Sequence, residues 1–120
     1  MTKIRTLIVD DNHAFRTSVY DYLQLAGLDP AMCGYGQDGL DLTESEEFDV
    51  ALVDVTLPDL TGWEVASHLR EQGFGGPIIM WSGSNRDEDR LEGSGADWFL
   101  LKPFDAGGLV DLIGHLIDKQ

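Results

Sequence analysis

The sequence is short of cysteine, of positive charge and of long apolar runs. Cys33 is the only cysteine, which excludes an intramolecular disulfide and a thiolate metal site, and its apolar neighbours predict a small buried side chain. Eight basic residues stand against 22 acidic ones, giving a net charge of -14, so nucleic acid and anionic membranes are poor partners. No apolar run approaches the ~20 residues of a membrane span and we see no signal peptide, so we expect a cytoplasmic protein.

The 120 residues are enough for one hydrophobic core, and we expect residues 1–120 to form a single domain. Five short apolar runs predict strands. Three of them are continuously apolar, which is typical of parallel strands covered on both faces. The predicted strands are residues 4–9, 30–33, 50–53, 77–81 and 99–101.

Apolar residues at helical spacing lie between these runs. They predict helices over residues 15–26, from Thr61 to Gly73, and over 105–117 with Asp105 as the cap, and two shorter helices at 37–45 and 86–93. Strands that alternate with helices imply an α/β fold. We therefore predict a doubly wound parallel sheet of five strand–helix units, (βα)5.

Charged and polar side chains follow four of the predicted strands. Asp10 and Asp11 follow the first, Asp54 the third, Ser82 the fourth and Lys102 the fifth. Ligands of open α/β sheets bind beyond the carboxyl ends of the strands, so we expect these side chains to form one site.

The chemistry of this set points to a metal and a phosphoryl group. Three clustered carboxylates repel one another unless a cation lies between them, and oxygen ligands without His or Cys favour Mg²⁺. A carboxylate such as Asp54 acts as a nucleophile toward phosphorus, giving an acyl phosphate. Lys102 is a compact cation that pairs with phosphate oxygens, and Ser82 is a hydrogen-bond donor for another oxygen.

Four segments together resemble the receiver domain of bacterial two-component response regulators, particularly the single-domain, chemotaxis-regulator-like type. The resemblance runs essentially end to end. It implies a flavodoxin-like fold with the strand order 2-1-3-4-5. The segments that carry it are Ile8-Val9-Asp10-Asp11-Asn12, residues 51–62 (ALVDVTLPDLTG), Met80-Trp81-Ser82-Gly83 and residues 95–104 (GADWFLLKPF).

The resemblance also implies the role of each acid. Asp54 matches the phosphoacceptor and belongs to the metal site. Asp11 matches a direct Mg²⁺ ligand, Asp10 the acid that holds metal-bound water, and the Thr56 carbonyl the backbone ligand.

The same resemblance implies a phosphate-binding and switch set. Lys102 matches the lysine that pairs with the phosphoryl group, and its bond to Pro103 is expected to be cis. Ser82, with Gly83 beside it, matches the switch hydroxyl. Phe99 matches the aromatic residue that changes rotamer with it, here without a tyrosine hydroxyl.

The expected function is phosphotransfer signalling. A histidine kinase or histidine phosphotransfer protein would phosphorylate Asp54, with self-catalysed transfer and autodephosphorylation rather than turnover as an enzyme. The phosphorylated domain would then switch a surface near residues 86–93, 99–101 and 105–117 that binds a protein partner not named by the sequence. No direct nucleic-acid or membrane contact is expected.

Two alternatives stand beside this interpretation. Haloacid-dehalogenase-like phosphatases also use a strand-end aspartate with magnesium, and Asp54-Val55-Thr56 is similar to their motif, although they place it on the first strand and need more chain. The other alternative is a binding module that keeps only the fold.

Other conspicuous residues have plainer interpretations. Trp81 is larger than the aliphatic residue usual beside the switch hydroxyl, and the segment 86–95 is short, with Leu91 its only apolar residue. Tryptophans are expected to pack, histidines to lie on the surface, Asp59 to form a turn and the acidic run 87–89 to be solvated. The residues so interpreted are Trp63, Trp81, Trp98, His13, His68 and His115.

Overall fold

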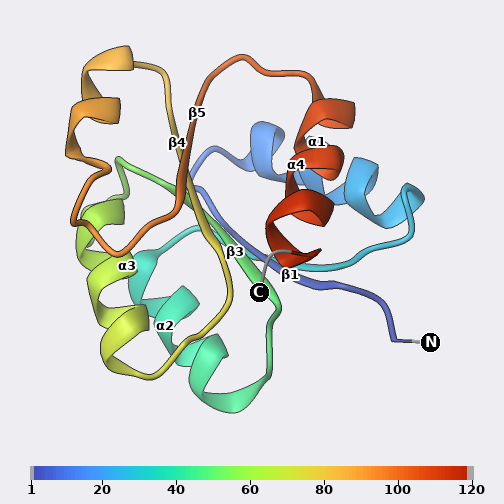
Figure 1. The fold of residues 1–120 in the computed structure, drawn as a ribbon, viewed down its shortest axis with the longest axis horizontal. Helices are drawn as coiled ribbons and strands as arrows, with labels where there is room; N and C mark the ends of the chain where they lie inside the picture. The colour runs from blue at the N-terminus through green and yellow to red at the C-terminus, as the bar shows by residue number, and fades with distance from the viewer. Residues whose placement is uncertain (1, 119–120) are drawn as a thin grey trace.

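The computed structural model describes residues 2–118 as one parallel sheet with helices on both faces (Figure 1). The strand order is β2-β1-β3-β4-β5 and every pairing is parallel, which confirms the predicted doubly wound fold and its order. The elements are β1 (Arg5–Val9), α1 (His13–Leu25), β2 (Asp29–Cys33), α2 (Gly36–Ser45), β3 (Val50–Asp54), α3 (Gly62–Glu71), β4 (Ile78–Ser82), the 3₁₀ helix η1 (Asn85–Arg90), β5 (Trp98–Leu101) and α4 (Ala106–Asp118).

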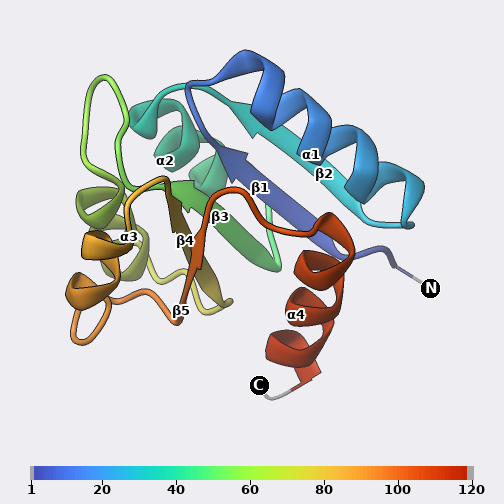
Figure 2. The ribbon, with the colours of Figure 1, turned by 90° about the horizontal axis from the view of Figure 1, so that it is seen from above.

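The hydrophobic core has one layer on each side of the sheet. Helices α2 and α3 cover one face of the sheet and α1 and α4 cover the other (Figures 1 and 2). The side chains of each pair of helices pack against the strands to form one core layer. The three continuously apolar runs form the central strands β1, β3 and β4, whose residues 7–9, 50–53 and 78–81 are fully buried. Burial on both faces explains why these strands carry no polar alternation.

Side-chain caps position the helices that begin beside the strand ends. The Asn12 side chain accepts a hydrogen bond from the Phe15 amide at the start of α1, and Thr61 and Glu64 form a capping box at the start of α3. Asp59 does more than form a turn. Its carboxylate accepts the first amides of α2, from Gly36 at 2.8 Å and Gln37 at 2.9 Å, and so ties the β3–α3 loop to α2.

The fourth helix differs from the prediction. The expected α-helix at 86–93 is a short 3₁₀ helix, Asn85–Arg90, and none of its residues is buried. Leu91 is the only apolar residue near it, so the segment has no apolar stripe to dock. Gly93 (φ 76°) and Gly95 (φ 94°) then adopt left-handed conformations that end any helix.

Arg70 of α3 anchors the chain that follows this short helix. Its guanidinium donates to the Gly95 carbonyl at 2.8 Å and to the Asp97 carboxylate at 2.9 Å. The same Asp97 oxygen accepts the Ile78 amide at 2.8 Å, beside the start of β5. These contacts hold β5 at the edge of the sheet although little apolar surface of η1 is buried.

Gly62 sets how closely α3 approaches the end of β3. Its amide donates to the Val55 carbonyl at 2.7 Å, and a Cβ on Gly62 would overlap the backbone carbonyl of Asp54 and crowd the Met80 side chain. A side chain here would therefore push α3 and the end of β3 apart.

We predict that Gly62→Ala lowers the free energy of unfolding by about 1–3 kcal/mol, the range of overpacking in a close-packed interior. Gly114→Ala in α4 is the matched control. A Cβ there meets nothing, so the better helix propensity of alanine should leave stability unchanged or raised by up to ~1 kcal/mol. Urea unfolding measures both, and equal effects of the two variants would contradict the close approach of α3.

Candidate functional site

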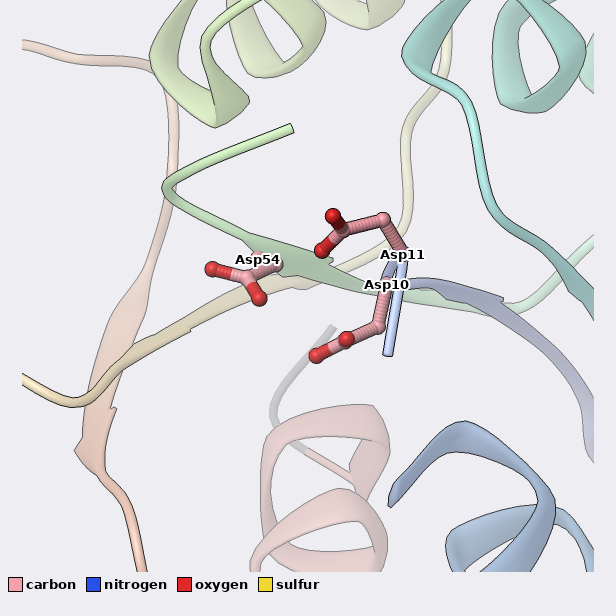
Figure 3. Close-up of side chains that lie close together, drawn as sticks. All are labelled: Asp10, Asp11 and Asp54. Carbon is pink, nitrogen blue, oxygen red and sulfur yellow. The ribbon is translucent and has the colours of Figure 1, made fainter. Parts of the chain in front are cut away.

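Three carboxylates meet at the carboxyl edge of the sheet (Figure 3). Asp54 is the last residue of β3, and Asp10 and Asp11 directly follow β1, the neighbouring strand. One oxygen from each lies within 4.8 Å of the others. Asp10 is fully buried, Asp54 is 8% exposed and Asp11 is exposed. The predicted cluster of acids is therefore present, with one solvent-facing member.

Lys102 joins the two buried acids. Its ammonium donates to Oδ2 of Asp10 at 2.7 Å and to Oδ2 of Asp54 at 3.0 Å. It reaches them from the end of β5, across the end of β4, and the Lys102–Pro103 peptide bond is cis. The ammonium also lies 4.2 Å from the centre of the Phe15 ring, a cation–π contact.

Backbone amides fix the remaining oxygens of the buried acids. The Thr56 amide donates to Oδ1 of Asp54 at 3.0 Å, and the Asn12 amide donates to Oδ1 of Asp10 at 2.8 Å. Both carboxylates are therefore held in defined orientations by the loops that follow their strands.

The electrostatics of the site disfavour the charged form of Asp54. Burial raises the pKa of Asp54 from 3.8 to about 6, and the charge of Asp10 adds to the rise, against the lowering effect of the Thr56 amide and Lys102. Burial lowers the pKa of Lys102, but its hydrogen bonds to Asp10 and Asp54 outweigh this and the net pKa is raised. One ammonium thus faces three carboxylates.

This arrangement fits a hard divalent cation. The candidate ligand atoms of Asp10, Asp11 and Asp54 are all oxygens, which suits Mg²⁺. A cation would favour the charged form of Asp54, against the burial and the Asp10 charge that raise its pKa. The exposed position of Asp11 leaves a side of the cluster open to water and to an incoming group.

Ser82 lies at the same edge but is directed elsewhere. It is the last residue of β4 and is 5% exposed, and its hydroxyl donates to the Asp87 carboxylate of η1 at 2.5 Å. It also accepts the Ser84 amide at 3.0 Å. The interpretation of Asp87 as one member of a solvated acidic run was wrong. No periodicity in the segment marks this residue, because the contact depends on the loop conformation.

Trp81 is a second site residue that the sequence interpretation missed. Its side chain is fully buried, as expected of a packing residue, but its indole Nε1 donates to Oδ2 of Asp10 at 2.8 Å. The unusual size of this residue beside Ser82 was the one available signal. Sequence gives no indication of where an indole nitrogen points.

The other expected site residues differ in their surroundings. Phe99 is buried in the core layer of α2 and α3, Thr56 is exposed above Asp54, and Gly83 is exposed beside Ser82. Burial raises the pKa of Cys33 to about 11, so its thiol stays protonated. The packing expectation was wrong for Trp98, which is 45% exposed on β5.

His13, His68 and His115 are exposed, as predicted. Among residues 2–118, no helix combines the length and the apolar character needed to cross a membrane.

Comparisons with known proteins agree on one family. The family described as the response regulator receiver domain matches residues 6–114. The chain is 33% identical to the transcriptional regulatory protein PcoR of Escherichia coli, over 96% of this chain and 52% of that protein. It thus spans about half the length of the curated relatives it matches.

Solved structures with a similar fold are matched over nearly their whole length. A CheY-like response regulator receiver domain protein from Methanospirillum hungatei JF-1 has a TM-score of 0.92 at 30% identity, covering 98% of this chain and 96% of that one. The response regulator TrrA of Thermotoga maritima, in complex with Mg(2+)-BeF, has a TM-score of 0.87 at 26% identity, covering 94% and 98%.

The raised pKa of Asp54 predicts a stability effect with a definite sign. Because the folded pKa lies above the unfolded one, metal-free protein loses stability as the pH rises from about 4 through 6, by up to about 3 kcal/mol. Asp54→Asn does not titrate, so its stability advantage over wild type should grow between about pH 4 and 6 and level off above that range.

Urea unfolding in the presence of a chelator measures this advantage, and a difference independent of pH would contradict it. Asp59→Asn is the matched control. Hydrogen bonds from the Gln37 and Gly36 amides lower the pKa of Asp59, so its replacement should not stabilise the protein at neutral pH.

Proposed function

Because this chain belongs to the response regulator receiver domain family, which accepts phosphoryl groups in two-component signalling, we propose that Asp54 is its phosphoacceptor. The observation that carries the proposal is the position of Asp54. It is a strand-end carboxylate, nearly buried, with Lys102 on one oxygen, the Thr56 amide on the other, and Asp10 and Asp11 beside it.

The transfer needs positioning and charge compensation more than covalent chemistry. An oxygen of Asp54 forms a bond to phosphorus while the bond from phosphorus to the donor histidine nitrogen breaks, and its electron pair returns to that nitrogen, which takes up a proton. Lys102 is close enough to Asp54 to pair with an oxygen of the new phosphoryl group. A histidine kinase or histidine phosphotransfer protein is the donor. Hydrolysis of the acyl phosphate by water returns the carboxylate and inorganic phosphate.

Asp10, Asp11 and Asp54, with the Thr56 carbonyl, are the residues proposed to hold Mg²⁺. Their oxygen ligands and close spacing support this, as does the Mg(2+)-BeF complex of TrrA. When bound, the ion supplies positive charge that offsets the carboxylates and the transferring phosphoryl group.

The switch requires Ser82 to exchange partners. Its hydroxyl donates to Asp87, so a hydrogen bond to a phosphoryl oxygen requires release of that carboxylate. The exchange would free one end of η1 and alter the surface that η1 shares with β5 and α4, with Gly83 and Phe99 adjusting beside it. We propose that this surface binds the output protein.

The phosphatase alternative is not supported. The chain belongs to the receiver family, and Asp54 ends β3, the third strand in the sequence, whereas those phosphatases place their aspartate on the first strand. A binding module that keeps only the fold is separated from the proposal by direct phosphorylation.

We predict an Asp54-dependent phosphoryl adduct. Protein incubated with Mg²⁺ and acetyl phosphate should gain the mass of one phosphoryl group, stable in acid and labile in base, and Asp54→Ala should gain none. Asp59→Asn is the matched control, since Asp59 lies in the loop that follows Asp54 but caps α2, and the variant should still be modified. The proposal fails if wild type forms neither this adduct nor a beryllofluoride complex.

We predict that Asp11→Ala weakens Mg²⁺ binding. Losing a direct metal ligand should weaken Mg²⁺ binding at least as much as losing a residue that hydrogen-bonds to a ligand. The dissociation constant for Mg²⁺ should therefore rise roughly tenfold or more. Calorimetry and Mg²⁺-dependent quenching of tryptophan fluorescence measure it, with Trp81 beside Asp10 as the reporter. Asp38→Ala is the control for charge alone, because Asp38 is exposed on α2 outside the cluster. Equal effects of the two variants would remove Asp11 from the site.

A further inference from the structure

Trp81 faces the site from the strand between the nucleophile and the lysine. It pairs in register with Asp54. The preceding residues Met80, Val9 and Val53 all belong to the core layer of α2 and α3. Because side chains alternate along a strand, Trp81, Asp10 and Asp54 all point to the side of α1 and α4. Trp81 therefore lies within the wall of the site.

Trp81 donates a hydrogen bond to Asp10 in addition to packing in the core. Oδ1 of Asp10 accepts the Asn12 amide, and Oδ2 accepts both the Lys102 ammonium and the Trp81 indole. Of the two donors on Oδ2, the ammonium ends a long flexible side chain that also contacts Asp54, and the indole is neutral and rigid.

Two aromatic rings hold the indole in place. Phe15 contacts Trp81 edge to face, with ring centres 5.2 Å apart and an angle of 87°, and Phe104 stacks on it at 5.4 Å and 30°. Phe15 comes from α1 and Phe104 from the chain between β5 and α4, so the indole is fixed from both sides.

We propose that Trp81 is a positioning residue, which keeps the Asp10 carboxylate directed at the metal position when Lys102 turns toward the phosphoryl group. This inference rests on the proposed function. As the ammonium moves to a phosphoryl oxygen, Oδ2 of buried Asp10 loses its charged donor, and a buried carboxylate oxygen without a donor is costly. The Trp81 indole remains, since nothing in the transfer displaces it, and Asp10 keeps its orientation.

Trp63 provides a matched comparison within the same chain. It is also buried, at 6% exposure, but its indole nitrogen has no hydrogen-bond partner among the described residues. Trp81→Phe and Trp63→Phe therefore remove the same atoms from two buried sites, and only Trp81→Phe removes a donor to the site.

The first test is Mg²⁺ affinity of the full chain, measured by calorimetry. Trp81→Phe should raise the dissociation constant about tenfold or more, the usual effect of losing an outer partner of a metal site. Trp63→Phe should leave it unchanged. With acetyl phosphate, the Mg²⁺ concentration needed for half-maximal phosphorylation should rise in Trp81→Phe far more than the rate at saturating Mg²⁺ falls. Wild-type affinity in a folded Trp81→Phe variant would overturn the proposal.

The second test does not depend on whether Trp81→Phe folds. In metal-free ¹⁵N-labelled protein, the indole proton of Trp81 should resonate downfield of that of Trp63, because it donates to a carboxylate. The assignment comes from Trp63→Phe and Trp98→Phe. Asp10→Asn should move the Trp81 resonance upfield and leave that of Trp63 in place. A Trp81 resonance that ignores Asp10→Asn would overturn the proposal.

The failures of the two ideas are distinguishable. If wild type forms the Asp54 adduct but Trp81→Phe binds Mg²⁺ as wild type does, only the role of Trp81 is wrong. If wild type forms no adduct while the indole resonance and Mg²⁺ affinity respond as stated, the phosphoacceptor role of Asp54 fails and Trp81 still positions Asp10.

Discussion

The contact of Lys102 with two buried carboxylates is the interaction on which the arrangement of the site depends. Asp10 and Asp54 lie at the ends of neighbouring strands in a region with little water, and burial together with the charge of Asp10 raises the pKa of Asp54. The ammonium crosses the end of β4 to bridge them. A site whose two buried acids share a single ammonium is suited to exchange, because the lysine and a divalent ion offset the same negative charge.

The buried sheet and a cluster of aromatic residues hold the carboxylates of the site in place. The strands β1, β3 and β4 are buried on both faces, and Gly62 lets α3 begin against the backbone of Asp54. On the other face, Phe15, Trp81 and Phe104 pack together beneath Lys102 and Asp10. Close packing of this kind leaves the carboxylates little freedom to move.

The segment after β4 differs from the sheet because it is held mainly by polar contacts and not by buried apolar side chains. The 3₁₀ helix η1 buries no residue, and the turn after it is anchored by polar contacts of Arg70 with Gly95 and Asp97. Its link to the site is the hydrogen bond between Ser82 and Asp87. A segment with little buried apolar surface changes conformation at low cost, and this makes η1 a suitable element for converting a change at Asp54 into a change of surface.

The sequence by itself determined the sheet, its parallel strands and the residues at their ends. Apolar runs, helical spacing and the charged residues that follow the runs are local features of the sequence. Because ligands bind at the carboxyl edge of an open sheet, these features predicted one site that contains Asp10, Asp11, Asp54 and Lys102. Tertiary structure decided which atoms touch. The indole of Trp81 on Asp10, the hydroxyl of Ser82 on Asp87 and the capping of α2 by Asp59 join residues that lie 71, 5 and up to 23 positions apart. Their directions depend on side-chain rotamers and loop conformations that no periodic pattern encodes. The reduction of the fourth helix to a 3₁₀ helix has a local cause instead, because the segment carries no apolar stripe that tertiary packing could bury.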